Sequence, residues 1–159
     1  MAEALSEANF RFLYRQAEGV IDAPTWLRAS FPPVAIALGL LAIALLIAPD
    51  QPRDLATQPF LDARVVATHV YFLICAFAVL ICAVAEYFVS AKRFTDRGKP
   101  AALAGLAPFA LLLAGAAHWY QPRSEGTMPE ALTYVFYAVA AGILAWNVIE
   151  LGFGASRRA

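Results

Sequence analysis

Four long apolar stretches, separated by short polar segments, dominate the pattern of residues along the chain. A helix needs roughly 20 apolar residues to cross a hydrocarbon layer about 30 Å thick, and each stretch has about that length. Pro32 and Pro33 open the first stretch, which a first helical turn tolerates because its N–H groups lack intrahelical partners. The pattern therefore predicts four membrane-spanning helices, at residues 31–48, 65–89, 101–120 and 131–153, with a kink at Pro108 in the third.

The residues before the first span follow a different pattern. Phe10, Leu13, Ala17 and either Val20 or Ile21 recur at helical spacing, and an Asp-Ala-Pro sequence ends the pattern. We expect a cytoplasmic amphipathic helix that lies on lipid headgroups or docks on a partner. The basic residues do not directly precede an apolar core and no cleavage-site pattern follows, so we do not expect a secretory signal.

Composition supports a membrane protein. Hydrophobic residues make up 61% of the 159 residues and charged residues only 15%, and the mean hydropathy is +0.62. Twelve basic and twelve acidic residues balance, so there is no basic excess that would favour nucleic acid as a partner. The lipid bilayer and other membrane protein subunits are the expected partners.

The spacing of the spans predicts how they pack. Short connections make consecutive spans antiparallel neighbours, so we expect an all-α, up-down four-helix transmembrane bundle. No repeat or flexible linker divides the chain, and the predicted parts are a cytoplasmic segment (1–30), the bundle (31–154) and a tail (155–159). Pairs of small residues four apart, which let helices approach closely in lipid, are expected to mark the seams: Ala101 with Gly105, Ala110 with Ala114, and Ala138 with Gly142.

The distribution of basic residues predicts the orientation, because cytoplasmic segments retain Lys and Arg. Three basic residues lie on one side of the predicted spans and nine on the other. We therefore expect both termini to be cytoplasmic. The side with three holds Arg53, Arg64 and Arg123; the side with nine holds Arg11, Arg15, Arg28, Lys92, Arg93, Arg97, Lys99, Arg157 and Arg158.

Motifs of common enzymes are absent from the sequence. There is no Walker A, dinucleotide-binding, zinc-protease or Gly-x-Ser-x-Gly pattern. Cys75 and Cys82 are seven residues apart on one predicted helix, about 10 Å along its axis, so they are not expected to pair with each other. The sequence favours a protein without catalytic activity of its own, although a redox subunit stays open.

The two histidines are the residues best placed for chemistry. His69 lies five residues after Arg64 in the second predicted span, and His118 lies five residues before Arg123 at the end of the third. Because these spans are antiparallel, both imidazoles are expected at matching depth. Two facing imidazoles can ligate the iron of a b-type haem, with Arg64 and Arg123 receiving its propionates. The same residues fit three other roles: a chlorophyll-type pigment site, a quinone site, or ordinary interfacial side chains without a cofactor.

Two carboxylates lie in the predicted spans. Glu86 and Glu150 are both near the cytoplasmic side, and a carboxylate in a membrane is costly unless it is paired or hydrated. We expect each of them either to extend its side chain to the membrane surface or to pair with a basic neighbour such as Lys92 or Arg93, and a role in proton entry is the alternative.

Three functions remain open on this basis. The first is a small membrane subunit that docks on or stabilises a larger membrane complex, which the shortage of chemistry favours. The second is an electron-transfer protein that holds haem or a related group between His69 and His118. The third is a small channel or transporter that acts as a homo-oligomer.

Overall fold

The computed structural model describes residues 2–47 and 62–155, and every regular element in these ranges is helical. Four helical stretches within them are long and apolar enough to cross a membrane, which confirms the predicted all-α membrane bundle. Two of the smaller elements, η1 and η2, are 3-10 helices, and η3 is a π-helical end of the last span. In chain order the elements are α1 (Ala2–Arg15), α2 (Ala23–Ile47), α3 (Ala63–Asp96), η1 (Ala101–Gly105), α4 (Leu106–Tyr120), η2 (Gln121–Arg123), α5 (Glu130–Val148) and η3 (Ile149–Phe153).

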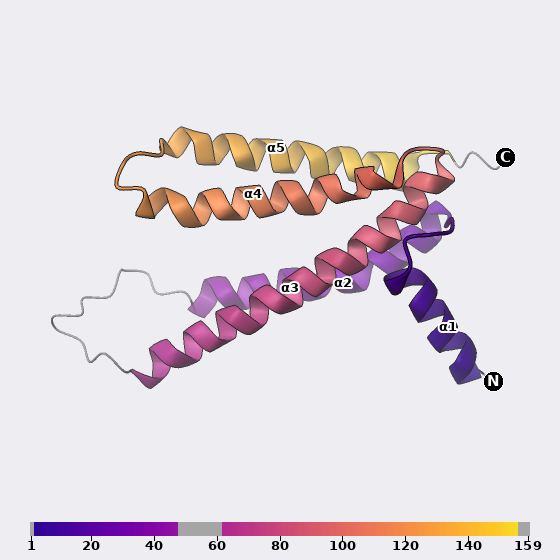
Figure 1. The fold of residues 1–159 in the computed structure, drawn as a ribbon, viewed down its shortest axis with the longest axis horizontal. Helices are drawn as coiled ribbons and strands as arrows, with labels where there is room; N and C mark the ends of the chain where they lie inside the picture. Colours follow the sequence, from indigo (N-terminus) through magenta and orange to yellow (C-terminus); the bar gives the residue numbers. More distant parts are fainter. Residues whose placement is uncertain (1, 48–61, 156–159) are drawn as a thin grey trace.

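The spans form two antiparallel hairpins, α2 with α3 and α4 with α5. The hairpins meet at the end of the molecule that carries both termini and diverge toward the other end (Figure 1). We call the first end the junction: it comprises α1, the start of α2, the last turns of α3, η1 and η3. The bundle is therefore closed at the junction and open at the opposite end.

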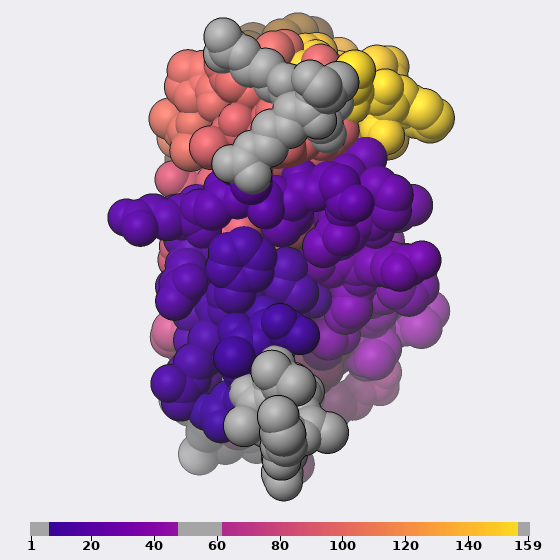
Figure 2. All heavy atoms as spheres, turned by 90° about the vertical axis from the view of Figure 1, so that its right-hand side faces the viewer, coloured from indigo at the N-terminus to yellow at the C-terminus, as the bar shows by residue number. Residues whose placement is uncertain are grey.

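An apolar core fills the junction. Val89, Phe94 and Leu151 are fully buried there, and Trp26 of α2 packs in the same cluster. The ring of Trp146 stacks on Phe94 with 5.7 Å between the ring centroids. Figure 2, which looks onto this end, shows the indigo and purple N-terminal helices spread across it, with the yellow C-terminal helix beside them. The core thus joins residues from both ends of the chain.

The amphipathic segment is helical over a shorter range than the sequence predicts. α1 ends at Arg15, and Gly19 then turns the chain with a φ of +108°. A Cβ at Gly19 would lie 2.6 Å from the Phe12 ring, so this turn requires glycine. Ile21 consequently leaves the helical pattern and enters the junction core.

The first span begins earlier than predicted, because α2 starts at Ala23. The carboxylate of Asp22 accepts a hydrogen bond from the N–H of Thr25, 3.0 Å away, and so caps the helix. Pro33 now lies inside the helix, where it has no N–H to offer the carbonyl of Ala29 one turn earlier. The hydroxyl of Tyr14 donates to that carbonyl at 2.9 Å instead, so α1 supplies the bond that the proline removes.

The third span changes helix type near its start. Residues Ala101–Gly105 form the 3-10 helix η1, and Pro108 lies in the first turn of α4, where its missing N–H costs little; the kink at Pro108 stays a prediction. Ala110 and Ala114 are buried against Ala140 of α5, as the small-residue pattern predicts. The Ala138 and Gly142 pair, by contrast, is exposed. Some predictions concern residues that lie outside the described ranges. These are the end of the first span at Ala48, the position of Arg53, and the tail with Arg157 and Arg158.

Candidate functional site

His69 and Arg64 lie near the start of α3, at the open end. Both side chains are exposed. Nδ1 of His69 is 2.8 Å from the carbonyl oxygen of Val65 in the preceding turn, so the ring bonds to its own helix. This bond leaves Nε2 as the nitrogen of His69 that is available to a ligand.

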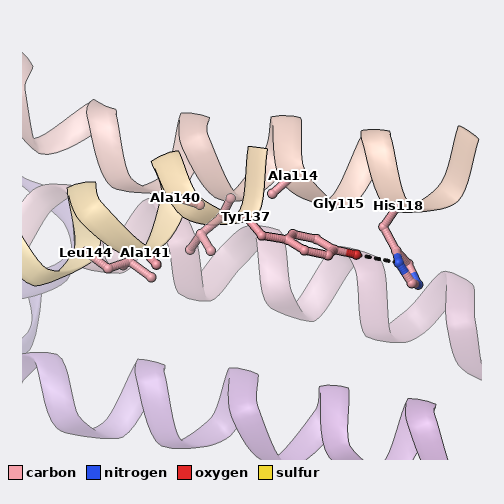
Figure 3. A pocket seen from close by; sticks show the side chains of 8 residues that line it. Ala114, Gly115, His118, Tyr137, Ala140, Ala141 and Leu144 are labelled. Carbon is pink, nitrogen blue, oxygen red and sulfur yellow. Dashed lines mark hydrogen bonds between the residues drawn. The ribbon is translucent and has the colours of Figure 1, made fainter. Parts of the chain in front are cut away.

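His118 lies at the end of α4 and bonds across the hairpin to α5. Its Nδ1 is 2.6 Å from the hydroxyl of Tyr137 (Figure 3). The pair closes one end of a groove of about 410 Å³ between the two helices. Three alanines, Gly115 and two leucines (Leu111 and Leu144) line the rest of the groove, so its wall is apolar apart from this pair. A ligand in the groove would meet hydrocarbon along its length and a polar pair at one end.

Arg123 in η2 is held beside the same helix. Its guanidinium lies 4.4 Å from the centre of the Trp119 ring and donates to the Trp119 carbonyl at 2.6 Å. A cation over an indole face is attracted by the ring quadrupole. Arg123 is therefore positioned by Trp119, although its side chain remains exposed.

The structure brings His118 to Tyr137 rather than to His69. His69 belongs to the hairpin of α2 and α3, His118 belongs to the hairpin of α4 and α5, and the hairpins diverge toward the end that carries both residues (Figure 1). A shared haem, pigment or quinone site between the two imidazoles stays a prediction, and it requires the open end to close around the ligand.

A polar cluster that the sequence did not reveal lies at the junction, where α2 packs on α3. Oε1 of Glu86 accepts hydrogen bonds from the hydroxyls of Ser30, at 3.1 Å, and Ser90, at 2.8 Å. Nε1 of Trp26 donates in turn to the Ser90 hydroxyl at 3.1 Å. The expectation that Glu86 pairs with Lys92 or Arg93 is wrong, because both cations are bound elsewhere.

Lys92 is fully buried, and the described hydrogen bonds of its ammonium group all go to main-chain carbonyls. It donates to Leu13 at 3.1 Å, to Phe88 at 3.0 Å and to Gln16. The carbonyls of Leu13 and Gln16 are among those that the end of α1 leaves without intrahelical partners, so Lys92 caps that helix. Lys92 and Arg93, which follow the predicted end of the second span at residue 89, therefore lie inside α3.

Arg93, only 1% exposed, joins the two hairpins. Its Nε donates to the carbonyl of Leu151 at 2.9 Å, and its Nη2 donates to the carbonyl of Gly154. It also forms an ion pair with Asp96 one turn further along α3. The end of the fourth span is thus bonded to the end of the second.

Glu150 is paired with basic residues, as predicted, but with different ones. Its carboxylate lies 2.7 Å from Arg97 and 2.6 Å from Lys99, in the turn between α3 and η1. The Oδ1 atom of Asn147, one turn earlier, is buried and has no hydrogen-bond partner among the described residues.

Sequence reasoning missed Tyr137 and the junction for different reasons. A tyrosine near the end of an apolar span is ordinary, and only the pairing of α4 with α5 places Tyr137 beside His118. Glu86 and Ser90 are four residues apart and so share a helix face, a pattern that indicates a polar contact on that face. Nothing in the sequence shows that Ser30 lies opposite.

The described part of the chain contains no cluster of three or more His, Cys, Asp or Glu side chains able to hold a metal ion, and Cys75 and Cys82 are free thiols. Comparison with protein families, with characterised proteins and with solved structures found no match.

Proposed function

We propose that this protein is a non-catalytic membrane subunit that docks on, and stabilises, a larger membrane complex. One observation carries the proposal: Ala138 and Gly142 are exposed on α5, on the face roughly opposite Ala140, which is buried against α4. A Cβ at Gly142 would meet nothing within 4 Å, so no described contact inside the chain accounts for a glycine there.

Small residues matter in a membrane because lipid tails give apolar helices no hydrophobic reason to associate. Helices in lipid associate instead through close van der Waals packing, and residues without large side chains let the two backbones approach. Ala145, one turn beyond Gly142, is exposed on the same face and extends it. This face of α5 is suited to a helix of a partner protein.

The divergence of the hairpins also supports docking. Large apolar side chains along α3, such as Phe77 and Ile81, are exposed. The hairpins join at the junction and diverge toward the other end, and the exposed apolar side chains along α3 are available to a partner helix. A partner helix that binds the folded chain stabilises it.

We further propose that both termini are cytoplasmic. The termini and the basic turn around Arg97 lie at the same end of the molecule (Figure 1). Cytoplasmic ends of membrane proteins are enriched in Lys and Arg, which favours this end as the cytoplasmic one.

Blue-native electrophoresis of membranes from the source cells tests the docking proposal. We expect the wild-type chain, of 17.2 kDa, to migrate in a larger complex, and we expect Gly142→Leu to lose that band because leucine holds the partner helix away. Gly39→Leu is the matched control: Gly39 lies in α2, and a Cβ there also meets nothing within 4 Å.

Three results would contradict the proposal. These are migration of the wild type as a single chain, a complex that survives Gly142→Leu, or equal loss of the complex in the Gly39→Leu control. Co-precipitation of two differently tagged copies, with no other chain in the band, would favour the homo-oligomeric channel or transporter instead.

A further inference from the structure

Glu86 stands out because it is a partly buried acid in a membrane-spanning helix, and no salt bridge of the described residues includes it. Its Oε1 accepts hydrogen bonds from Ser30 and Ser90, whereas its Oε2 is buried and has no hydrogen-bond partner among the described residues. The salt bridges of the described chain do not include Glu86. Two neutral hydroxyls are therefore its only polar partners in this part of the chain.

The nearest cations are committed to other acceptors. On α3, Lys92 donates to three carbonyls, and Arg93 bonds Asp96 and two carbonyls near the end of the chain. From η3, Glu150 is neutralised by Arg97 and Lys99. None of these described cations forms a salt bridge with Glu86.

The other elements packed around Glu86 are α1 and α2. From α2 come Trp26 and Ser30, which are uncharged, while Arg28 is exposed. From α1 comes Tyr14, whose pKa is raised by burial; a negative charge on Glu86 would add to that rise. Tyr14 therefore supplies no positive charge that would balance an ionised Glu86.

A buried carboxylate in this position is costly. Moving an ion out of water costs several kcal/mol even after the protein relaxes, and a group without a counter-ion takes up a proton instead of paying that cost. A neutral carboxyl still accepts two hydroxyl hydrogen bonds at its carbonyl oxygen, and Oε1 makes both. These two bonds are compatible with either form of the carboxyl group, and it is the burial of Oε2 without a donor that favours the neutral acid.

We propose that Glu86 is a proton-binding site: its carboxyl group holds a proton at neutral pH and joins α2 to α3 as a neutral group. The proton comes from the aqueous phase and forms the O–H bond at Oε2, and no electron is transferred. Ionisation places an uncompensated charge in the seam between α2 and α3, so it loosens the end of the molecule that holds α1.

Infrared difference spectroscopy of the full chain in lipid tests this proposal. At neutral pH we expect the carbonyl stretch of a protonated carboxylic acid, distinct from the carboxylate bands, in the wild type. Glu86→Gln removes that band, and Glu130→Gln, which changes a carboxylate near the start of α5 that accepts from Tyr134, retains it. Absence of the band in the wild type, or its survival in Glu86→Gln, would overturn the proposal.

Ser30→Ala provides a second test that keeps Glu86 in place. Loss of one donor to Oε1 strengthens the carbonyl bond, so the band shifts to higher frequency without disappearing. A band that does not move would belong to another carboxyl and would overturn the proposal. Melting temperatures in sodium and in choline salts test whether a metal cation takes the place of the proton. A melting temperature that is higher in sodium for the wild type, but not for Glu86→Gln, would overturn the proposal.

Discussion

Nζ of Lys92 in α3 lies 3.1 Å from the main-chain oxygen of Leu13 in α1, a residue 79 positions earlier in the chain. This contact attaches the N-terminal helix to the membrane-spanning part. The ring of Phe12 lies 5.1 Å from the same ammonium group and adds a cation–π contact. Lys92 therefore fixes α1 against the junction rather than marking an exposed cytoplasmic loop.

We predict that Lys92→Met releases α1. Each carbonyl left buried without a donor costs about 1–3 kcal/mol, so the helix detaches before the spans unfold. Limited trypsin digestion should cut after Arg15 several-fold faster than in the wild type. Lys99→Met is the control, because Lys99 pairs with Glu150 near the C-terminal end of the last span rather than with α1. Equal cleavage rates in Lys92→Met and the wild type would show that α1 is held by its apolar contacts alone.

We predict that Arg93→Met destabilises the chain more than any surface charge substitution. It removes the buried ion pair between Arg93 and Asp96, and breaking a buried pair costs about 3–5 kcal/mol. Thermal unfolding in detergent measures the effect. Arg11→Met, which breaks the exposed pair with Glu7, should cost about 1 kcal/mol or less. A similar fall in melting temperature for both variants would contradict the structural role given to Arg93.

The Asp22 cap of α2 predicts that the stability of the protein depends on pH in the acid range. Hydrogen bonds from the Thr25 side chain and then from the Thr25 N–H lower the pKa of Asp22 below its ordinary value. A lowered folded pKa means that the stabilisation is present above the unfolded value, near 4, and is lost as the pH falls through the folded value. Melting temperatures from pH 6 to pH 3 should therefore fall more steeply for the wild type than for Asp22→Asn. Parallel curves would contradict this assignment.

The separation of the hairpins predicts the absorption spectrum. A low-spin b haem needs two imidazoles on one iron, and His69 and His118 lie on hairpins that diverge. We expect protein purified from haem-replete cells to lack a Soret band with split visible bands after dithionite reduction. A reduced spectrum with those bands, lost in both His69→Ala and His118→Ala, would show instead that the open end closes around a haem.

Reporter fusions test the orientation. Fusions after Arg97 and after Arg158 should report a cytoplasmic position, and fusions after Asp54 and after Glu125 should report the opposite side. If the fusion after Arg97 reports the exterior, the orientation is inverted, although the hairpin pairing described above is unaffected.

The sequence by itself determined the class of the protein and its spans. Long uncharged apolar stretches have few alternatives to membrane-spanning helices, because backbone polar groups in lipid must bond within the helix. The seam between α4 and α5 was also predictable at Ala110 and Ala114, since small residues four apart lie on one helix face. These features depend on residues that are close together in the sequence, so the sequence alone contains the information needed to predict them.

The tertiary structure alone decided where the polar groups go. Lys92 and Arg93 follow an apolar span, as basic residues at a membrane surface do, and only the return of α1 and η3 to the end of α3 buries them. The same is true of Glu86, whose partner Ser30 lies 56 residues earlier, and of His118, which meets Tyr137 rather than His69. Hydrogen bonds act over about 3 Å, so their partners are decided by how helices pack and not by the order of residues along the chain.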